Sequence, residues 1–361
     1  MKIIKVNLKK CSYDIAIGSN IINLLPKFIA KLRLGYDAYI ITNSLIKNRY
    51  AGSLNKALMK SGFKVRFKII PDAEKSKSIG MATLLLKDIA HYDKRRQLFI
   101  LAFGGGVIGD LAGFVASIYK RGIPYLQIPT TLLAQVDSAI GGKTAVDLAE
   151  GKNLVGAFYQ PRLVLSDVKF LNTLNQRQLR SGLAEVIKYG IIKDAQLFSF
   201  LEKRYRDILG IKPAALEYAV KRCSRIKADI VERDEREEGG IRTILNFGHT
   251  LGHAIEVASH YKTYNHGEAL ALGILIAADI SRTLNLIASP IYERIKNLIE
   301  AVGLPLKIRG VSLKDIINAH YRDKKFSGQK NKFVLIKGIG KAKVVENIPL
   351  GIIRESLKKR F

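Results

Sequence analysis

Hydrophobic and polar positions in the first half of the chain alternate between two patterns. Short apolar runs at 38–43, 64–70, 98–103 and 125–130 are the clearest strand candidates. The stretches 45–62 and 78–93 between them carry apolar residues three and four positions apart, which favours crossover helices. This alternation predicts a Rossmann-like α/β domain with a mostly parallel sheet.

After about residue 175 the pattern changes to long helical periodicity with few strand signals. The longest apolar run, Ala269–Ala278, is ended by Asp279 and predicts a buried helix, because a bilayer span needs about 20 residues. Turn and capping residues lie at 175–182. We therefore expect an α/β domain over residues 1–178 and a mainly α-helical C-terminal domain over residues 179–361.

Composition narrows the class of protein. The net charge of +29 raises the possibility of a nucleic-acid partner, but the basic residues are spread along the chain without a recognisable nucleic-acid-binding motif. We expect a solvated basic surface that attracts anionic metabolites, and no nucleic acid. Lysines interrupt the apolar residues at the start of the chain, and the two cysteines have no CxxC spacing. These features predict a cytoplasmic protein without a membrane segment.

A glycine-rich segment follows the third of the predicted strands. Gly104, Gly106 and Gly109 have the spacing G-x-G-x-x-G before a predicted helix, which would let backbone N–H groups approach a pyrophosphate. A tight turn between strand and helix explains the bare motif equally well. The motif also lies about a hundred residues into the chain, whereas ordinary dinucleotide-binding domains carry it after the first strand.

A second polar, glycine-punctuated region follows the strand at 125–130. It contains Thr130, Thr131, Asp137, Lys143 and Lys152 in the series TT, D, GGKT and GKN. Lysines beside glycine turns suit phosphates and hydroxyl groups. The alternative is an ordinary solvated loop.

Histidines cluster in the second half. His249 and His253 lie four positions apart, on one face of a predicted helix, and His260 and His266 follow within a short span. This clustering favours a metal or phosphate site over isolated core histidines. The glutamate of H-E-x-x-H is absent, which argues against a zinc protease.

Glu185 is a candidate third ligand, because a catalytic zinc usually has about three protein ligands. It lies on a predicted apolar helix, where an unpaired carboxylate would be unfavourable. A simple ion pair with Lys188, one turn along, is the alternative.

Together these segments resemble the 3-dehydroquinate synthase family. The resemblance covers about residues 70–325 and is carried, in the family's order, by GGGVIGDLAGFVASIYKRG, QIPTTLLAQVDSAIGGKTAV, GKNLVGAFYQP, SGLAEVIKYGII, LNFGHTLGHAIE and HGEALALG. It implies that Glu185, His249 and His266 hold a divalent metal, zinc or cobalt. It also implies NAD binding by Asp72, Glu74, Lys77, Gly105, Gly106, Val107, Ile108, Gly109, Asp110, Thr130, Thr131, Lys143, Lys152, Phe170, Leu171, Asn172 and Thr173.

The resemblance also implies the remaining site residues. The catalytic set would be Asp137, Lys143, Lys188, Lys227, Arg242 and His253, and the substrate set would be Lys152, Asn153, Asn246 and Lys324. Arg121 resembles the arginine that reaches into the neighbouring subunit, which implies a homodimer. The segment DEREEGGIR is one residue longer than the family's usual spacing, so the roles of Glu237 and Glu238 stay open, as does the choice between Lys324 and Lys325.

The implied activity converts 3-deoxy-D-arabino-heptulosonate 7-phosphate into 3-dehydroquinate and phosphate, a step of the shikimate pathway to chorismate and the aromatic amino acids. It proceeds by transient oxidation with NAD, phosphate elimination, re-reduction and intramolecular aldol closure. The alternatives are another sugar-phosphate cyclase or a metal- and NAD-dependent alcohol or glycerol dehydrogenase. The lysine-rich substrate set favours a phosphorylated sugar acid. A basic nucleic-acid-binding protein is the alternative from a different class.

Overall fold

The computed structural model describes residues 1–71, 73–94, 97–322 and 331–361. Contacts between Cα atoms divide the chain into two compact units, the first made of residues 1–174 and 216–236 and the second of residues 175–215 and 237–361. Helix α7 (Pro213–Arg233) therefore belongs mostly to the first unit, although the segments on both sides of it belong to the second. The proposed domains, 1–178 and 179–361, differ from these units chiefly in α7.

A seven-stranded sheet forms the centre of the first unit, in the order β1-β2-β9-β6-β5-β3-β4. Its strands are β1 (Lys2–Val6), β2 (Tyr13–Gly18), β3 (Asp37–Thr42), β4 (Lys64–Ile69), β5 (Leu98–Gly104), β6 (Tyr125–Pro129) and β9 (Leu163–Asp167). Only β1 runs antiparallel to its neighbour. The predicted, mostly parallel sheet is confirmed, and the four predicted strands are β3 to β6.

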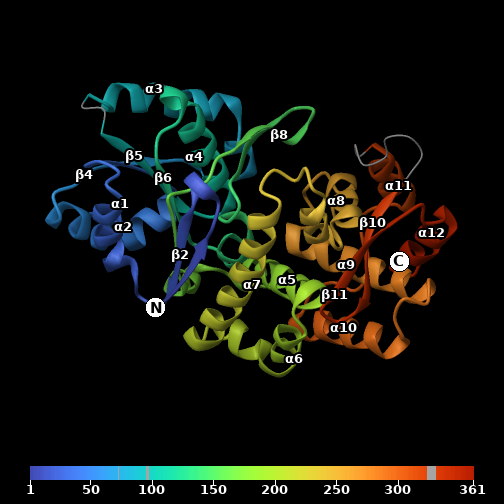
Figure 1. Cartoon of the computed structure of the whole chain (residues 1–361). Helices are drawn as coiled ribbons and strands as arrows, with labels where there is room; N and C mark the ends of the chain where they lie inside the picture. Colours follow the sequence, from blue (N-terminus) through green and yellow to red (C-terminus); the bar gives the residue numbers. More distant parts are fainter. Residues whose placement is uncertain (72, 95–96, 323–330) are drawn as a thin grey trace. The chain divides into compact units, whose positions relative to one another are not determined.

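Helices cover both faces of this sheet (Figure 1). In β3, Ala38 and Ile40 pack into one core with α1 (Leu25–Leu32) and α2 (Ser44–Lys60). The alternate residues Tyr39 and Ile41 pack into a second core with α3 (Ile79–Tyr92) and α4 (Gly106–Ile118), since successive strand residues point to opposite faces. Strand β3 leads into α2 and its neighbour β5 leads into α4, so their carboxyl ends form a topological switch point, where α/β sheets bind ligands.

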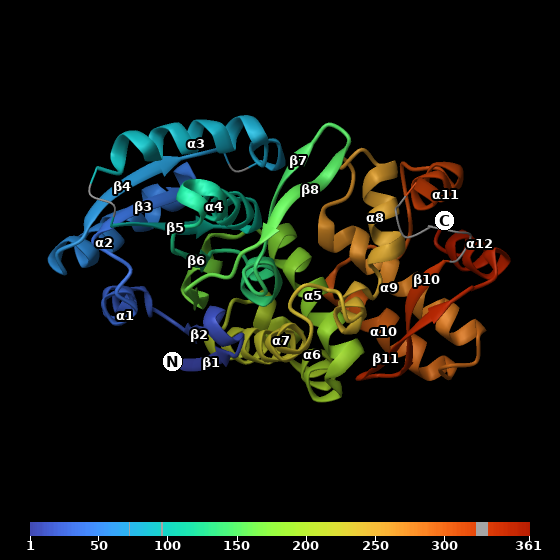
Figure 2. The ribbon, with the colours of Figure 1, turned by 45° about the horizontal axis from the view of Figure 1, so that its top comes forward.

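A long hairpin, β7 (Lys143–Leu148) and β8 (Gly151–Phe158), also belongs to the first unit (Figure 2). It packs on α4 at Gly113, where a Cβ atom would lie 2.4 Å from Cγ2 of Thr144. Helix α7 is held to the same unit by Arg225, which donates to the carbonyl of Lys5 at 3.1 Å, and by Glu232, which accepts the N–H of Asn7 at 3.0 Å.

The second unit is mainly helical, as predicted. Its helices are α5 (Gln176–Lys193), α6 (Ala195–Leu209), α8 (His249–Ala258), α9 (His266–Thr283), α10 (Ser289–Val302), α11 (Leu313–Arg322) and α12 (Leu350–Lys358). A hairpin of β10 (Lys332–Gly338) and β11 (Lys341–Glu346) was not predicted. Residues 269–278 are buried in α9, which confirms that prediction. Among the described helices, none combines the length and the apolar character that crossing a bilayer requires.

Glycines allow the helices around α9 to approach closely. A Cβ atom at Gly273 of α9 would lie 1.9 Å from the carbonyl oxygen of Gly248, the residue before α8. A Cβ atom at Gly267 would lie 2.3 Å from the backbone of Ser181 in α5, and the Gly267 N–H donates to the Ser181 hydroxyl at 3.0 Å. These contacts bring the first turns of α8 and α9 beside α5.

Candidate functional site

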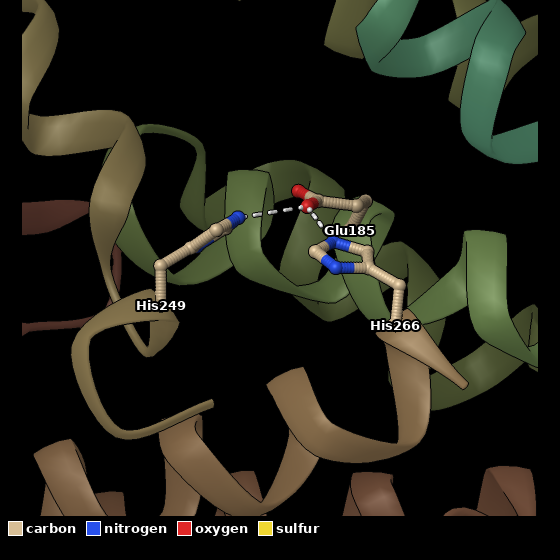
Figure 3. Close-up of side chains that lie close together, drawn as sticks. All are labelled: Glu185, His249 and His266. Atoms are coloured by element: carbon tan, nitrogen blue, oxygen red, sulfur yellow. Dashed lines mark hydrogen bonds and ion pairs between the residues drawn. The ribbon is translucent and has the colours of Figure 1, made fainter. Parts of the chain in front are cut away.

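The predicted metal ligands converge from α5, α8 and α9 (Figure 3). The Nε2 atoms of His249 and His266 lie 3.3 Å and 3.1 Å from the same carboxylate oxygen, Oε1 of Glu185. Their candidate ligand atoms all lie within 4.8 Å of one another. His249 and His266 are the first residues of their helices, so the close helix packing places both rings over Glu185.

These residues fit a divalent metal such as zinc or cobalt. Two imidazole nitrogens and one carboxylate oxygen form a ligand set known from catalytic zinc sites, which keep a further position open for substrate or water. Nδ1 of His249 lies 3.2 Å from the carbonyl oxygen of Phe247. With the N–H on Nδ1, the lone pair of Nε2 is free to bind a cation shared with Glu185. The other oxygen of Glu185, Oε2, lies 2.5 Å from Nζ of Lys188.

The charges in this cluster shift its pKa values. Burial alone would raise the pKa of Glu185, but Lys188 and the two imidazoles hold it well below its usual range. Burial would lower the pKa of His266, but Glu185 and Glu256 outweigh that effect and raise it to about 10. Burial and Lys188 lower the pKa of His249. A bound cation would take the place of the proton on His266.

His253 lies beside this cluster, with its ring centroid 5.2 Å from that of His249 and its side chain 47% exposed. With Glu256 and His266 it forms a second group of potential metal ligands. Glu256 was not predicted as a site residue. The spacing H-x-x-x-H-x-x-E at 249, 253 and 256, which puts all three on one face of a helix, could have identified it.

Predicted NAD residues follow three parallel strands at the carboxyl edge of the sheet. Gly105–Asp110 follow β5, Thr130 and Thr131 follow β6, and 170–173 follow β9. The N–H of Thr130 donates to the Gly104 carbonyl at 2.9 Å, and a Cβ atom at Gly105 would lie 3.1 Å from Thr131. The first turn of α4, which begins at Gly106, provides backbone N–H groups at this edge.

The segment 168–173 forms a 3-10 helix in which the predicted residues differ in exposure. Phe170 and Leu171 are buried, and the centroid of the Phe170 ring lies 5.2 Å from that of the Phe103 ring. Asn172 is exposed and Thr173 is partly exposed. A ligand at this edge therefore has access to the side chains of Asn172 and Thr173, whereas Phe170 supports the core.

A buried lysine links the residues after β4 to the glycine-rich helix. Nζ of Lys77 lies 2.5 Å from Oδ2 of Asp110 and also contacts Oδ1 of Asn153. Burial alone would lower the pKa of Lys77, but the Asp110 carboxylate outweighs it and raises that pKa. Glu74 pairs with Lys152 at 3.2 Å. Predicted residue Asp72 lies outside the described residues.

A cavity of about 500 Å³ in the first unit brings several predicted residues together. It is lined by Asp110, Asp137, Lys143, Asn153 and Lys227, and by residues that were not predicted, including Ser138 and Phe158. Nζ of Lys227, in α7, lies 2.7 Å from the carbonyl oxygen and 2.8 Å from Oδ1 of Asp137. Asp137 belongs to a single π-helical turn, Ala134–Ser138, a feature common at functional sites.

The remaining predicted residues are not among those that line the cavity. Arg242 is 1% exposed, and its Nε lies 3.8 Å from Oε1 of Glu237. Asn246 ends the 3-10 helix Ile241–Asn246, immediately before the segment that leads to His249. Arg121 is exposed and has a φ of 65°. Lys324 lies outside the described residues.

Comparisons with known proteins find similarity to one family of enzymes along nearly the whole chain. Residues 67–181 match the model of the 3-dehydroquinate synthase N-terminal domain, and residues 182–326 match that of its C-terminal domain. The 3-dehydroquinate synthase of Desulforamulus reducens is 46% identical over 349 residues, which cover 96% of this chain and 97% of that protein.

Two solved cyclases have a similar structure. A 2-deoxy-scyllo-inosose synthase, complexed with carbaglucose-6-phosphate, NAD+ and Co2+, superposes with a TM-score of 0.91 at 26% identity and full coverage of both chains. A 2-epi-5-epi-valiolone synthase from Streptomyces hygroscopicus, with NAD+ and Zn2+ bound, superposes with a TM-score of 0.88 at 26% identity and 98% coverage of both chains.

Proposed function

This chain belongs to the 3-dehydroquinate synthase family, and we propose that it converts 3-deoxy-D-arabino-heptulosonate 7-phosphate into 3-dehydroquinate and phosphate. The observation that carries this proposal is the convergence of two imidazole Nε2 atoms on one buried carboxylate oxygen, beside a buried lysine. That arrangement suits a metal-assisted reaction on an anionic hydroxylated substrate. The cofactors are NAD and a divalent metal, zinc or cobalt.

Glu185, His249 and His266 would hold the metal. A cation held by these side chains would lower the pKa of the substrate hydroxyl at the carbon to be oxidised by NAD. Lys188 keeps the second oxygen of Glu185 paired, so the buried carboxylate stays ionised and available as a ligand. His253, whose side chain is exposed one turn from His249, would contact the substrate phosphate.

NAD would bind along the carboxyl edge of the sheet in the first unit. The backbone N–H groups of 105–110 would receive the pyrophosphate at the start of α4, and Thr130 and Thr131 would border it. Lys77 pairs with the Asp110 side chain in the first turns of this helix. Lys143, which lines the adjoining cavity, would balance the negative charge of the bound molecule.

The basic and polar groups proposed for substrate binding would balance its carboxylate and phosphate. They are Lys152, Asn153, Lys188, Lys227, Arg242 and Asn246, with Lys324 from outside the described residues. Asp137 would bind substrate hydroxyl groups, since Lys227 holds both its carbonyl and its carboxylate. Each charge-assisted hydrogen bond of this kind contributes about 1.5–3 kcal/mol.

We further propose that the protein works as a cytoplasmic homodimer without a nucleic-acid partner. Arg121 would reach the neighbouring subunit, because it is exposed and lies in a tight turn in which both Lys120 and Arg121 have a left-handed backbone. Light scattering at micromolar concentration tests the dimer. Electrophoretic mobility of mixed DNA and RNA at physiological salt tests the absence of nucleic-acid binding.

One assay tests the reaction itself. The purified, zinc-loaded protein is incubated with a catalytic amount of NAD and the heptulosonate phosphate, and inorganic phosphate and dehydroquinate are measured together. We expect equal amounts of both products and no net accumulation of NADH. Phosphate release only from a different sugar phosphate would support another cyclase, and stoichiometric NADH formation from glycerol would support a dehydrogenase.

A further inference from the structure

We propose that Glu256 is a positioning residue, which orients the imidazole of His266 so that Nε2 is presented to the metal. This inference rests on the proposed metal site of Glu185, His249 and His266. It adds a residue that does not touch the metal but acts through one of its ligands.

Glu256 lies on the side of His266 opposite the proposed metal. Oε1 of Glu256 is 3.6 Å from Nδ1 of His266, while Nε2 of the same ring is 3.1 Å from Oε1 of Glu185. The two carboxylates therefore face the two nitrogens of one imidazole. Glu256 is 8% exposed, so little water competes for this contact.

The other histidine ligand has an equivalent support. Nδ1 of His249 lies 3.2 Å from the carbonyl oxygen of Phe247, which is an acceptor for an N–H at Nδ1. Metal-binding histidines generally donate their second N–H to a carboxylate or carbonyl, which fixes the ring and raises the basicity of the ligand nitrogen. Among the described residues, Glu256 is the acidic group that faces Nδ1 of His266.

The backbone of Glu256 is held independently of its side chain. Its carbonyl oxygen accepts the Tyr261 N–H at 2.9 Å and the Ser259 hydroxyl at 2.9 Å, at the end of α8. Close packing at Gly252, where a Cβ atom would lie 3.2 Å from the Ala269 carbonyl oxygen, holds α8 against α9. Removal of the carboxylate should therefore disturb the His266 ring without removing these backbone contacts.

The same geometry offers a competing interpretation. Glu256 Oε2 lies 4.0 Å from Nε2 of His253, and His253, Glu256 and His266 could hold a second cation. In that case the protein would bind two metal ions, and loss of Glu256 would remove one of them. The metal stoichiometry separates the two interpretations.

The test uses the full chain with Glu256→Ala and Glu256→Gln, and with Glu300→Ala as a matched control on the exposed side of α10. Zinc affinity is measured by competition with a chromophoric chelator, and the ligand field is measured from the visible absorption of the cobalt-loaded protein. We expect one zinc ion per chain in the wild type. We expect about 10- to 100-fold weaker binding and an altered cobalt spectrum in Glu256→Ala.

The conservative variant distinguishes positioning from a general structural role. Glu256→Gln keeps an oxygen acceptor and should restore much of the affinity and the wild-type cobalt spectrum, and Glu300→Ala should match the wild type. Unchanged affinity and spectrum in Glu256→Ala would overturn the inference while leaving the proposed function intact. Two zinc ions in the wild type and one in the variant would also overturn it, and a wild type that binds no zinc would overturn the proposed metal site itself.

Discussion

Nε2 of His266 lies 3.1 Å from Oε1 of Glu185, although 81 positions separate the two residues in the sequence. The sequence left two interpretations of Glu185 open, a metal ligand or an ion-pair partner of Lys188. The geometry is compatible with both interpretations at once, because Oε1 faces the two imidazoles and Oε2 faces Lys188. Lys188 thus compensates the charge of a buried carboxylate.

Removal of a proposed histidine ligand should strongly weaken metal binding. We expect His266→Ala to weaken zinc binding about 100-fold or more, since each ligand supplies a substantial share of the binding free energy. Activity should fall in parallel, while the far-ultraviolet circular dichroism stays unchanged. Full turnover by the metal-free variant would contradict the ligand assignment.

Glu185→Gln should have an additional effect on stability, because it leaves the Lys188 ammonium buried without its partner. Breaking one half of a buried pair costs about 3–5 kcal/mol, which urea unfolding of the metal-free protein can measure. The double variant Glu185→Gln with Lys188→Met should recover most of this loss, yet still fail to bind zinc. Equal stability of the single variant and the wild type would indicate that solvent reaches Lys188.

Gly273→Ala should destabilise the metal site through packing alone. Its new methyl group would lie 1.9 Å from the Gly248 carbonyl oxygen, so α8 must move away from α9. We expect a loss of about 1–3 kcal/mol or more in the free energy of unfolding, together with weaker zinc binding. Gly351→Ala in α12 is the control, because nothing lies within 4 Å of that position, and it should gain about 0.5–1 kcal/mol.

Lys77→Met should weaken NAD binding and stability together. The variant leaves the Asp110 carboxylate without its partner, beside the helix start proposed to bind the pyrophosphate. We expect a loss of about 1.5–3 kcal/mol in unfolding free energy. NADH affinity, followed by fluorescence titration, should fall about tenfold, equivalent to about 1.4 kcal/mol. Adding Asp110→Asn should restore part of the stability, and unchanged NADH affinity in Lys77→Met would separate this network from the cofactor site.

The stability of the first unit should decrease at low pH because of Asp88. Burial alone would raise its pKa, but hydrogen bonds from Tyr39, Arg66 and Lys68 lower it to about 2. Because the folded pKa lies below the unfolded value, this contribution is complete above about pH 4 and is lost as the pH falls toward 2. We expect it to be worth about 1–2 kcal/mol, allowing for solvent screening. Urea unfolding between pH 2 and 6 should show a shallower pH dependence in Asp88→Asn.

Three of the four strands predicted from the sequence are buried on both faces, whereas β4 is exposed or partly exposed throughout, and the fully buried β9, with only three apolar residues in Leu163–Asp167, was not predicted. Strands β3, β5 and β6 are fully buried and therefore appear as continuous apolar runs. Edge strand β1 is exposed at Lys2, Ile3 and Lys5, so its lysines hide the strand pattern. Strand β10 has a run of four buried residues, but the described elements before it in the second unit are helices. Its partner β11 has no regular alternation of exposed and buried residues, so neither strand was predicted.

The candidate site could be predicted only in part, because residue types and spacing are visible in the sequence but contacts between distant elements are not. Residue types and spacing identified the histidine cluster, and the family resemblance selected Glu185 from among many carboxylates. Glu256 was not identified, although its spacing from His249 and His253 is visible in the sequence, because its contact with the His266 ring on another helix is not. The contact of Lys227 with Asp137 was equally hidden, since helical periodicity assigned α7 to the helical half.

The path of α7 bears on how the protein can be divided. The chain passes from one unit to the other near residues 174, 215 and 236, so neither unit is a continuous segment. A shortened chain that stops at residue 174 would lack Lys227, Arg225 and Glu232, and its sheet would lose the helix that holds β1 and the Asp137 turn. Cutting the chain at a single point therefore leaves at least one unit incomplete. To produce the first unit by itself, a linker must replace residues 175–215.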